Sequence, residues 1–232
     1  MALDQRSRTR LAESTAEGAA ALRAAGNRER DEAVRNPDFL ARRFIAPRPS
    51  LTTFAKLPGS GRIVRTVAEW RTPGSYYFEI ARTHHIDAIV RTEVAAGVGQ
   101  IVFLGAGYDS RAYRMPELKD ARVFEVDHAI TAEPKRKRLA AVFGEVPPHV
   151  SYVQVDFNRD DLGKRLSAAG YKDDEPALFI LSGVAPYLPE EAVRETLGWV
   201  ARQASGSSIV FDYLWTEAFD DPQPYHGLPE LP

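Results

Sequence analysis

Cysteine is absent from this 232-residue sequence. Disulfide bonds, thiolate catalysis and cysteine-ligated metal sites are therefore excluded, and the composition fits an intracellular protein. No apolar run approaches the roughly 20 residues that a membrane-spanning helix needs. The N-terminal segment, MALDQRSRTRLAESTAEG, also lacks the apolar core of a secretory signal. We therefore expect a cytoplasmic protein without a membrane partner.

The sequence also lacks a dominant charge, because 30 lysines and arginines are balanced by 32 aspartates and glutamates, for a formal net charge of −2. Such a chain has no overall field to attract nucleic acid, and we expect no nucleic-acid partner. Hydrophobic residues make up 44% and charged residues 27% of the chain, as in ordinary globular proteins. The length suits one compact α/β unit with a large core, or such a unit with a helical appendage.

The most informative stretch runs from Ile101 to Arg114, IVFLGAGYDSRAYR. Its first four residues are β-branched or large and apolar, which is typical of a buried parallel strand. Gly105 and Gly107 then predict a tight turn whose backbone a ligand can approach closely. We expect the next segment to open a helix whose N-terminal amides face that ligand. A plain boundary between a strand and a turn is the alternative.

A second strand pattern follows from Arg122 to Asp127, RVFEVD. It places Glu125 and Asp127 at its carboxyl end, about 20 residues past the glycine turn, where an acidic residue hydrogen-bonds the ribose hydroxyls of a nucleoside cofactor. The two patterns together predict a Rossmann-like cofactor site.

The glycine turn departs from the dinucleotide-binding form G-x-G-x-x-G, because Ser110 stands where the third glycine belongs. Asp109, just before it, would repel a pyrophosphate but can accept a hydrogen bond from the ammonium group of S-adenosylmethionine, which carries no phosphate. The turn therefore favours S-adenosylmethionine over NAD, and an NAD-dependent oxidoreductase is the weaker hypothesis.

Four segments, GAGYDSRAYR, VFEVD, VQVDF and SGVAPYLP, occur in this order and resemble the leucine carboxyl methyltransferase family, with its bacterial and polyketide-tailoring O-methyltransferase relatives. The resemblance runs from the N-terminal helical region to about the fifth strand. It implies a class I methyltransferase-like Rossmann sheet in residues 97–232, preceded in residues 1–96 by a helical lid that contacts the substrate.

The resemblance implies a role for Arg82, which lies in a stretch similar to the family's alanine-arginine-threonine segment. The arginine of that segment holds the methionyl carboxylate of the cofactor, a task that suits the planar fork of a guanidinium. The alternative is a surface arginine paired with Glu79. Arg42 and Arg43 are weaker candidates for an anion contact, because paired basic residues on a helix are mostly solvated.

The resemblance also assigns the end of the third strand, since Asp156 and Phe157 fall where related enzymes hold adenine. Helix capping by Asp156 or its neighbours is the alternative. Ser182 stands where the family commonly has glutamate, so one acidic contact is missing. The residues predicted to bind S-adenosyl-L-methionine are Arg82, Gly105, Ala106, Gly107, Asp109, Glu125, Asp127, His128, Asp156, Phe157 and Ser182.

Neither a metal site nor a firm catalytic residue is predicted. His84 and His85 are adjacent on a predicted helix, so they point about 100° apart and cannot both face one ion. A carboxylate acceptor needs no base, whereas a phenol would need one, for which His84, His85 and Tyr187 are the candidates.

Further strands are expected at residues 150–157, 177–181 and 207–214, and helices at 76–90, 129–143, 162–169 and 190–204. The basic run from Lys135 to Arg138 is expected to lie solvated on the outside of the sheet. Only 18 residues follow Leu214, whereas members of the family complete a seven-stranded sheet. We expect the last strands to be missing and the open sheet edge to be covered by the tail, by a second copy of the chain or by a separate fragment.

The sequence thus predicts an S-adenosylmethionine-dependent O-methyltransferase that acts on a carboxylate or a phenolic hydroxyl of a small molecule, in secondary metabolism. The alternative is a non-catalytic protein of the same fold that binds a cofactor or a partner.

Overall fold

The computed structural model describes residues 5–45 and 59–213, with side chains from residue 15 onward. Its chain forms two compact units, which meet in sequence between Asp87 and Ala88. This division lies inside helix α5 (Ser75–Ala95), whereas the boundary predicted at residue 96 lies just after that helix.

The first unit is helical. It contains α1 (Gln5–Gly26), a 3₁₀ turn (Glu32–Val34), α2 (Ala41–Phe44), α4 (Gly61–Arg71) and the first part of α5. Helix α1 ends at Gly26. Ala25, Tyr76 and Ile80 form a small buried core against which Leu22, Val64 and Ala68 pack.

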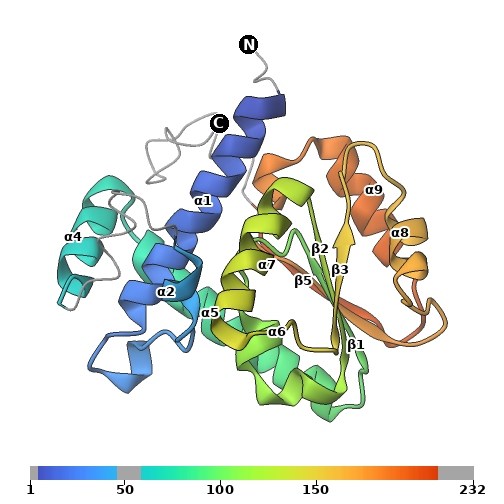
Figure 1. Cartoon of the computed structure of the whole chain (residues 1–232), viewed down its shortest axis with the longest axis horizontal. Coiled ribbons are helices and arrows are strands. Elements are labelled where there is room, and N and C mark those ends of the chain that lie inside the picture. The colour runs from blue at the N-terminus through green and yellow to red at the C-terminus, as the bar shows by residue number, and fades with distance from the viewer. Residues whose placement is uncertain (1–4, 46–58, 214–232) are drawn as a thin grey trace. The chain divides into compact units, whose positions relative to one another are not determined.

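The second unit is a mixed α/β layer structure built on one parallel sheet (Figure 1). Its strands are β1 (Gln100–Leu104), β2 (Arg122–Asp127), β3 (Val150–Gln154), β4 (Ala177–Leu181) and β5 (Ser208–Phe211), in the order β3-β2-β1-β4-β5. Every residue of β1 and β4 is buried, as expected for central strands covered on both faces. The predicted α/β fold and all five predicted strands are confirmed, with β3 and β5 shorter than expected.

Helices cover both faces of the sheet in the second unit (Figure 1). They are α6 (Arg111–Arg114), α7 (Ala129–Phe143), α8 (Leu162–Ala168) and α9 (Glu190–Val200), with 3₁₀ turns at Pro116–Asp120 and Ala185–Tyr187. Residues of α8 and α9 pack with Phe124 and Phe179 in one apolar cluster. Alternate strand residues such as Glu125 point to the opposite face, where Lys135 of α7 meets Glu125.

The segment after the glycine turn is helical as predicted, but α6 is a single turn of four residues. A helix of four residues is too short for the predicted helix-dipole contribution to ligand binding, since the dipole sums over aligned peptide units.

Strand β5 forms one edge of the sheet, because it pairs with β4 alone among the described residues. Residues 214–232, one of the predicted covers for this edge, lie outside the described residues.

Candidate functional site

The strand order places a topological switch point between β1 and β4. From this central pair the chain proceeds outward to β2 and β3 on one side and to β5 on the other. Connections after β1 and β4 therefore leave the sheet in opposite directions, and ligands of open parallel sheets bind at the carboxyl ends of such strands. The predicted glycine turn follows β1 at this point.

Gly105 opens the turn in a left-handed backbone conformation, with φ of 72°. An added Cβ at this position would lie 2.5 Å from a methyl carbon of Val184, in the loop after β4. The amides of Gly105 and Ala106 both donate to the carbonyl of Val126, at 2.8 and 3.0 Å. Glycine is therefore required where the β1 turn passes between the ends of β2 and β4.

Asp127 joins the glycine turn to the end of β2. Its Oδ2 accepts a hydrogen bond of 2.6 Å from the amide of Gly107, and its Oδ1 accepts one of 2.7 Å from the amide of His128. Burial raises the pKa of Asp127 above its ordinary value, although part of the residue remains exposed, and the two amides act in the opposite direction. Gly107 of the glycine pattern and Asp127 of the acidic pattern are thus directly hydrogen-bonded to each other.

Asp109 and Ser110 are engaged with neighbouring arginines. The Asp109 carboxylate accepts from the backbone amide of Arg111 at 2.8 Å and forms an ion pair with its guanidinium. The hydroxyl of Ser110 accepts from Nε of Arg114 at 2.9 Å. The contact predicted between Asp109 and a cofactor ammonium group stays a prediction, and it would have to share this carboxylate with Arg111.

Glu125 lies deeper in the sheet than Asp127. Both it and its partner Lys135 are nearly inaccessible, at 3% and 1% exposed, with 2.7 Å between Lys135 Nζ and Glu125 Oε1. Burial raises the pKa of Glu125 to about 6, while the Lys135 cation acts in the opposite direction. Its predicted ribose contact stays untested, but this geometry gives the carboxylate an internal partner. The expectation that the whole basic run is solvated is wrong for Lys135.

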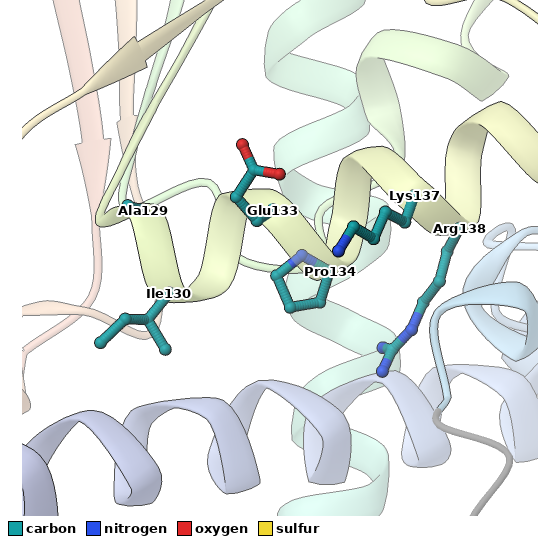
Figure 2. Close-up of a pocket in the computed structure, with 6 residues that line it drawn as sticks. All are labelled: Ala129, Ile130, Glu133, Pro134, Lys137 and Arg138. Atoms are coloured by element: carbon teal, nitrogen blue, oxygen red, sulfur yellow. The ribbon is translucent and has the colours of Figure 1, made fainter.

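His128 caps α7, because its Nδ1 accepts from the amide of Ile130 at 3.3 Å. The six residues Ala129, Ile130, Glu133, Pro134, Lys137 and Arg138 line a hollow of about 550 Å³ along this helix (Figure 2). His128, the predicted cofactor-binding residue nearest to them in sequence, immediately precedes the first of these lining residues.

Asp156 and Phe157 lie in the loop after β3. Asp156 Oδ1 accepts from the backbone and side-chain nitrogens of Asn158, at 3.0 and 3.1 Å. Phe157 is half-buried against the apolar cluster. The cap of α8 is Asp161, whose carboxylate accepts from the amide of Lys164, so Asp156 does not serve as that cap. Its predicted contact with adenine stays a prediction.

Ser182 has an acidic partner that the sequence interpretation missed. Its hydroxyl donates to Asp212, just after β5, at 3.2 Å. The same carboxylate accepts from the amide of Gly183 at 2.7 and 2.9 Å. A carboxylate therefore stands beside Ser182, supplied by the neighbouring strand. The signal for it was the aspartate that ends the apolar run SSIVFDY, at the same edge of the sheet as Asp127.

Arg82 belongs to the first unit, where it forms an ion pair with Glu79 and stacks over the Phe78 ring at 5.2 Å. Glu79 is 5% exposed and also binds Arg23 of α1 at 2.9 Å. Arg23 in turn binds Asp38 at 2.8 Å. Arg82 thus belongs to an ion-pair network of two arginines and two carboxylates, whose formal charges cancel. The alternative pairing with Glu79 is therefore present. The predicted contact of Arg82 with the cofactor stays a prediction.

The weaker candidates are mainly exposed. Arg42, Arg43, His84 and His85 are exposed, and Tyr187 is half-buried. The ring nitrogen Nε2 of His84 lies 2.8 Å from the carbonyl oxygen of Arg35. Within residues 5–45 and 59–213, no group of three His, Cys, Asp or Glu side chains is placed to hold a metal ion. No helix of that part of the chain is long and apolar enough to cross a membrane.

Known proteins resemble this chain over most of its length. The family model for leucine carboxyl methyltransferase matches residues 16–201. A Streptomyces coelicolor protein named "Putative S-adenosyl-L-methionine-dependent methyltransferase SCO7813" is 34% identical over 84% of this chain and 67% of its own length. A Bacillus subtilis protein with the same description, YktD, is 34% identical over 58% of this chain and 44% of its own length.

A solved structure from Thermobifida fusca, described as a "putative methyltransferase", is 21% identical, with a TM-score of 0.45 over 66% of this chain and 59% of that one. The chain spans between 43% and 67% of the length of these and similar curated relatives. Because the family model covers well over half of the sequence, the chain belongs to the leucine carboxyl methyltransferase family.

Proposed function

We propose that this chain is an S-adenosyl-L-methionine-dependent O-methyltransferase that methylates a carboxylate or a phenolic hydroxyl of a small molecule. The observation that carries the proposal is the bond between the Gly107 amide and Asp127 Oδ2, which closes the glycine turn against the end of β2 at the switch point. The names of the relatives support the same cofactor.

The residues at this turn fit a nucleoside cofactor that carries no phosphate. A carboxylate offers about four lone-pair positions, and the amides of Gly107 and His128 occupy two of those on Asp127. Asp127 can therefore accept ribose hydroxyls as well. The turn also departs from the dinucleotide-binding pattern, because Ser110 stands where the third glycine belongs.

The methyl-transfer reaction requires the protein mainly to position the cofactor and the acceptor. S-adenosylmethionine supplies a methyl group on an electrophilic sulfonium that an oxygen nucleophile attacks in line. Asp127, Asp156 and Phe157 of the second unit would orient the adenosine part of the cofactor. Most of the rate would come from fixing the attack geometry and excluding water.

A carboxylate is the acceptor that demands least of this chain. It is ionised at neutral pH, whereas a phenol has a pKa near 10 and needs a base. We therefore propose a carboxylic acid as the first acceptor class to examine, with a phenol second. Tyr187, His84 and His85 remain the candidate bases for the phenol.

A labelled-methyl assay tests this function. The purified chain would be incubated with S-adenosylmethionine tritiated in its methyl group and with a panel of small carboxylic acids and phenols. We expect the label to appear in products that are hydrolysed by mild base. Methyl esters are hydrolysed under these conditions, whereas aryl methyl ethers are not. Asp127→Asn should lower the yield at least tenfold, while Asp120→Asn, which alters an exposed carboxylate, should leave it unchanged.

The two ways for the assay to fail have different meanings. A chain that binds the cofactor product S-adenosylhomocysteine but labels no acceptor would favour the non-catalytic alternative. A folded chain that neither binds the cofactor product nor labels an acceptor would contradict the proposed function altogether.

A further inference from the structure

The basic run of α7 contacts three tyrosine rings of the second unit. Cations over aromatic faces within about 6 Å of the ring centre are attracted by the ring quadrupole. Three of the four cations meet this condition: Lys135 over Tyr113 at 5.5 Å, Arg136 over Tyr152 at 5.1 Å and Arg138 over Tyr108 at 4.8 Å. The run is therefore part of the packing of α7 and not only a solvated face.

The Arg138 contact reaches the glycine turn directly. Tyr108 lies in the turn between Gly107 and Asp109, and only 2% of its surface is exposed. The residue before it donates the amide hydrogen bond to Asp127, and the residue after it is bound to Arg111. A cation that holds the Tyr108 ring thus acts on the middle of this turn.

The same helix is anchored at a second point. Thr131, Lys135 and Leu139 are the buried residues of α7, spaced four apart along one side of the helix. Lys135 on that side binds Glu125 of β2 at 2.7 Å, two residues before Asp127. α7 is therefore attached both to the strand that ends in Asp127 and to the turn that donates to it.

We propose that Arg138 is a positioning residue for the glycine turn. Its guanidinium holds the Tyr108 ring and thereby keeps the Gly107 amide hydrogen-bonded to Asp127. The effect on cofactor binding rests on the proposed function, whereas the effect on the turn itself does not. Lys137, its neighbour in sequence, extends from the helix in a different direction (Figure 2) and is exposed. Lys137 thus provides a matched control for loss of one cation.

The first experiment is residue-resolved amide hydrogen exchange by NMR on the chain without ligand. Arg138→Met keeps the aliphatic stem and removes the guanidinium. We expect the Gly107 amide to exchange roughly three- to tenfold faster in this variant, the range that one cation–π contact supports. Lys137→Met should leave that rate within about twofold of the wild type. Equal exchange of Gly107 in wild type and Arg138→Met would overturn the proposal.

The second experiment is calorimetric titration with S-adenosylhomocysteine, at a temperature where thermal melts show every variant to be folded. Arg138→Met should weaken binding roughly three- to tenfold, and Arg138→Lys, which restores a cation, should recover most of the loss. Tyr108→Leu should weaken binding to the same degree as Arg138→Met, and the double variant should be no weaker than either single one. A purely structural role would lower the melting temperature and leave the affinity of the folded protein unchanged.

The outcomes separate this proposal from the proposed function. Binding by the wild type with unchanged binding by Arg138→Met would overturn the positioning role alone, as would losses that multiply in the double variant. A wild type that binds no S-adenosylhomocysteine would contradict the proposed function, and the Gly107 exchange rates would still decide whether Arg138 holds the turn.

Discussion

The two faces of the sheet in the second unit are built from the same strands but from different chemistry. Towards α8 and α9, Phe179 packs between Tyr171 and Trp199, with ring centres 6.1 and 5.6 Å away. Towards α7, Glu125 and Lys135 form a buried ion pair. β2 contributes to both faces, because Phe124 points to the first and Glu125 to the second. The face towards α8 and α9 is thus an apolar face packed with aromatic rings. The face that adjoins the glycine turn is the charged face, because it adds a buried ion pair to apolar residues such as Phe103 and Ile180.

The largest expected effect comes from breaking the apolar face. Phe179 is completely buried, so Phe179→Ala should cost about 4 kcal/mol of stability, through lost burial and the cavity that remains. Urea unfolding followed by circular dichroism would measure it. Phe143→Ala, at a residue 43% exposed on α7, is the control and should cost less than half as much. A cost below about 1 kcal/mol for Phe179→Ala would show that this face is not the main source of stability.

Breaking the charged face should come next. Lys135→Met leaves the Glu125 carboxylate buried without its cation, which we expect to cost about 3 kcal/mol. Adding Glu125→Leu removes the orphaned charge, so the double variant should return to within about 1 kcal/mol of the wild type. The same urea experiment measures both. A double variant as unstable as the single one would mean that the pair contributes through packing and not through its charges.

The charged face should also give stability a pH dependence that the apolar face lacks. The pKa of Glu125 is raised from 4.5 to about 6 by burial. Between these values the folded state holds more protons than the unfolded state, so the contribution of Glu125 to stability falls as pH rises from 4.5 through 6, by about 2 kcal/mol. Urea unfolding at pH 4.5, 5.5 and 7 on wild type and Glu125→Gln measures it as the difference between the two curves. Parallel curves would refute this assignment.

The smallest expected effect lies at the end of β4. Ser182→Ala removes one partly exposed hydrogen bond of 3.2 Å to Asp212, while the amide of Gly183 keeps its bonds to the same carboxylate. We therefore expect a loss of about 0.5 to 1 kcal/mol, measured by thermal unfolding. A loss above about 2 kcal/mol would mean that the hydroxyl, and not the amide, holds Asp212 in place.

The strands and the glycine turn could be predicted because their signals are local. Apolar runs such as those of β1 and β4 bury on both faces whatever their neighbours are, and Gly105 is needed wherever a turn demands a positive φ. The link between this turn and Asp127 followed from the general rule for parallel sheets. These features follow from local composition or from a rule that applies to parallel sheets in general.

The features that escaped prediction depend on particular side-chain contacts that neither a local pattern nor a general rule for parallel sheets predicts. Lys135 sits in a run of four basic residues, and only its position on the inner side of α7 and the presence of Glu125 on β2 make it a buried partner. Asp212 reaches Ser182 from the next strand, a separation of 30 residues. The length of α6 was also uncertain from sequence, because four residues carry no helical periodicity.

Titration of the purified wild-type chain with S-adenosylhomocysteine tests the central claim most directly, because it asks whether the turn between β1 and Asp127 binds the cofactor. We predict micromolar binding that Asp127→Asn weakens by about 1 to 3 kcal/mol, and that Asp120→Asn leaves unchanged. A well-folded wild type that gives no binding heat across several temperatures, or binding that is indifferent to Asp127, would contradict the account.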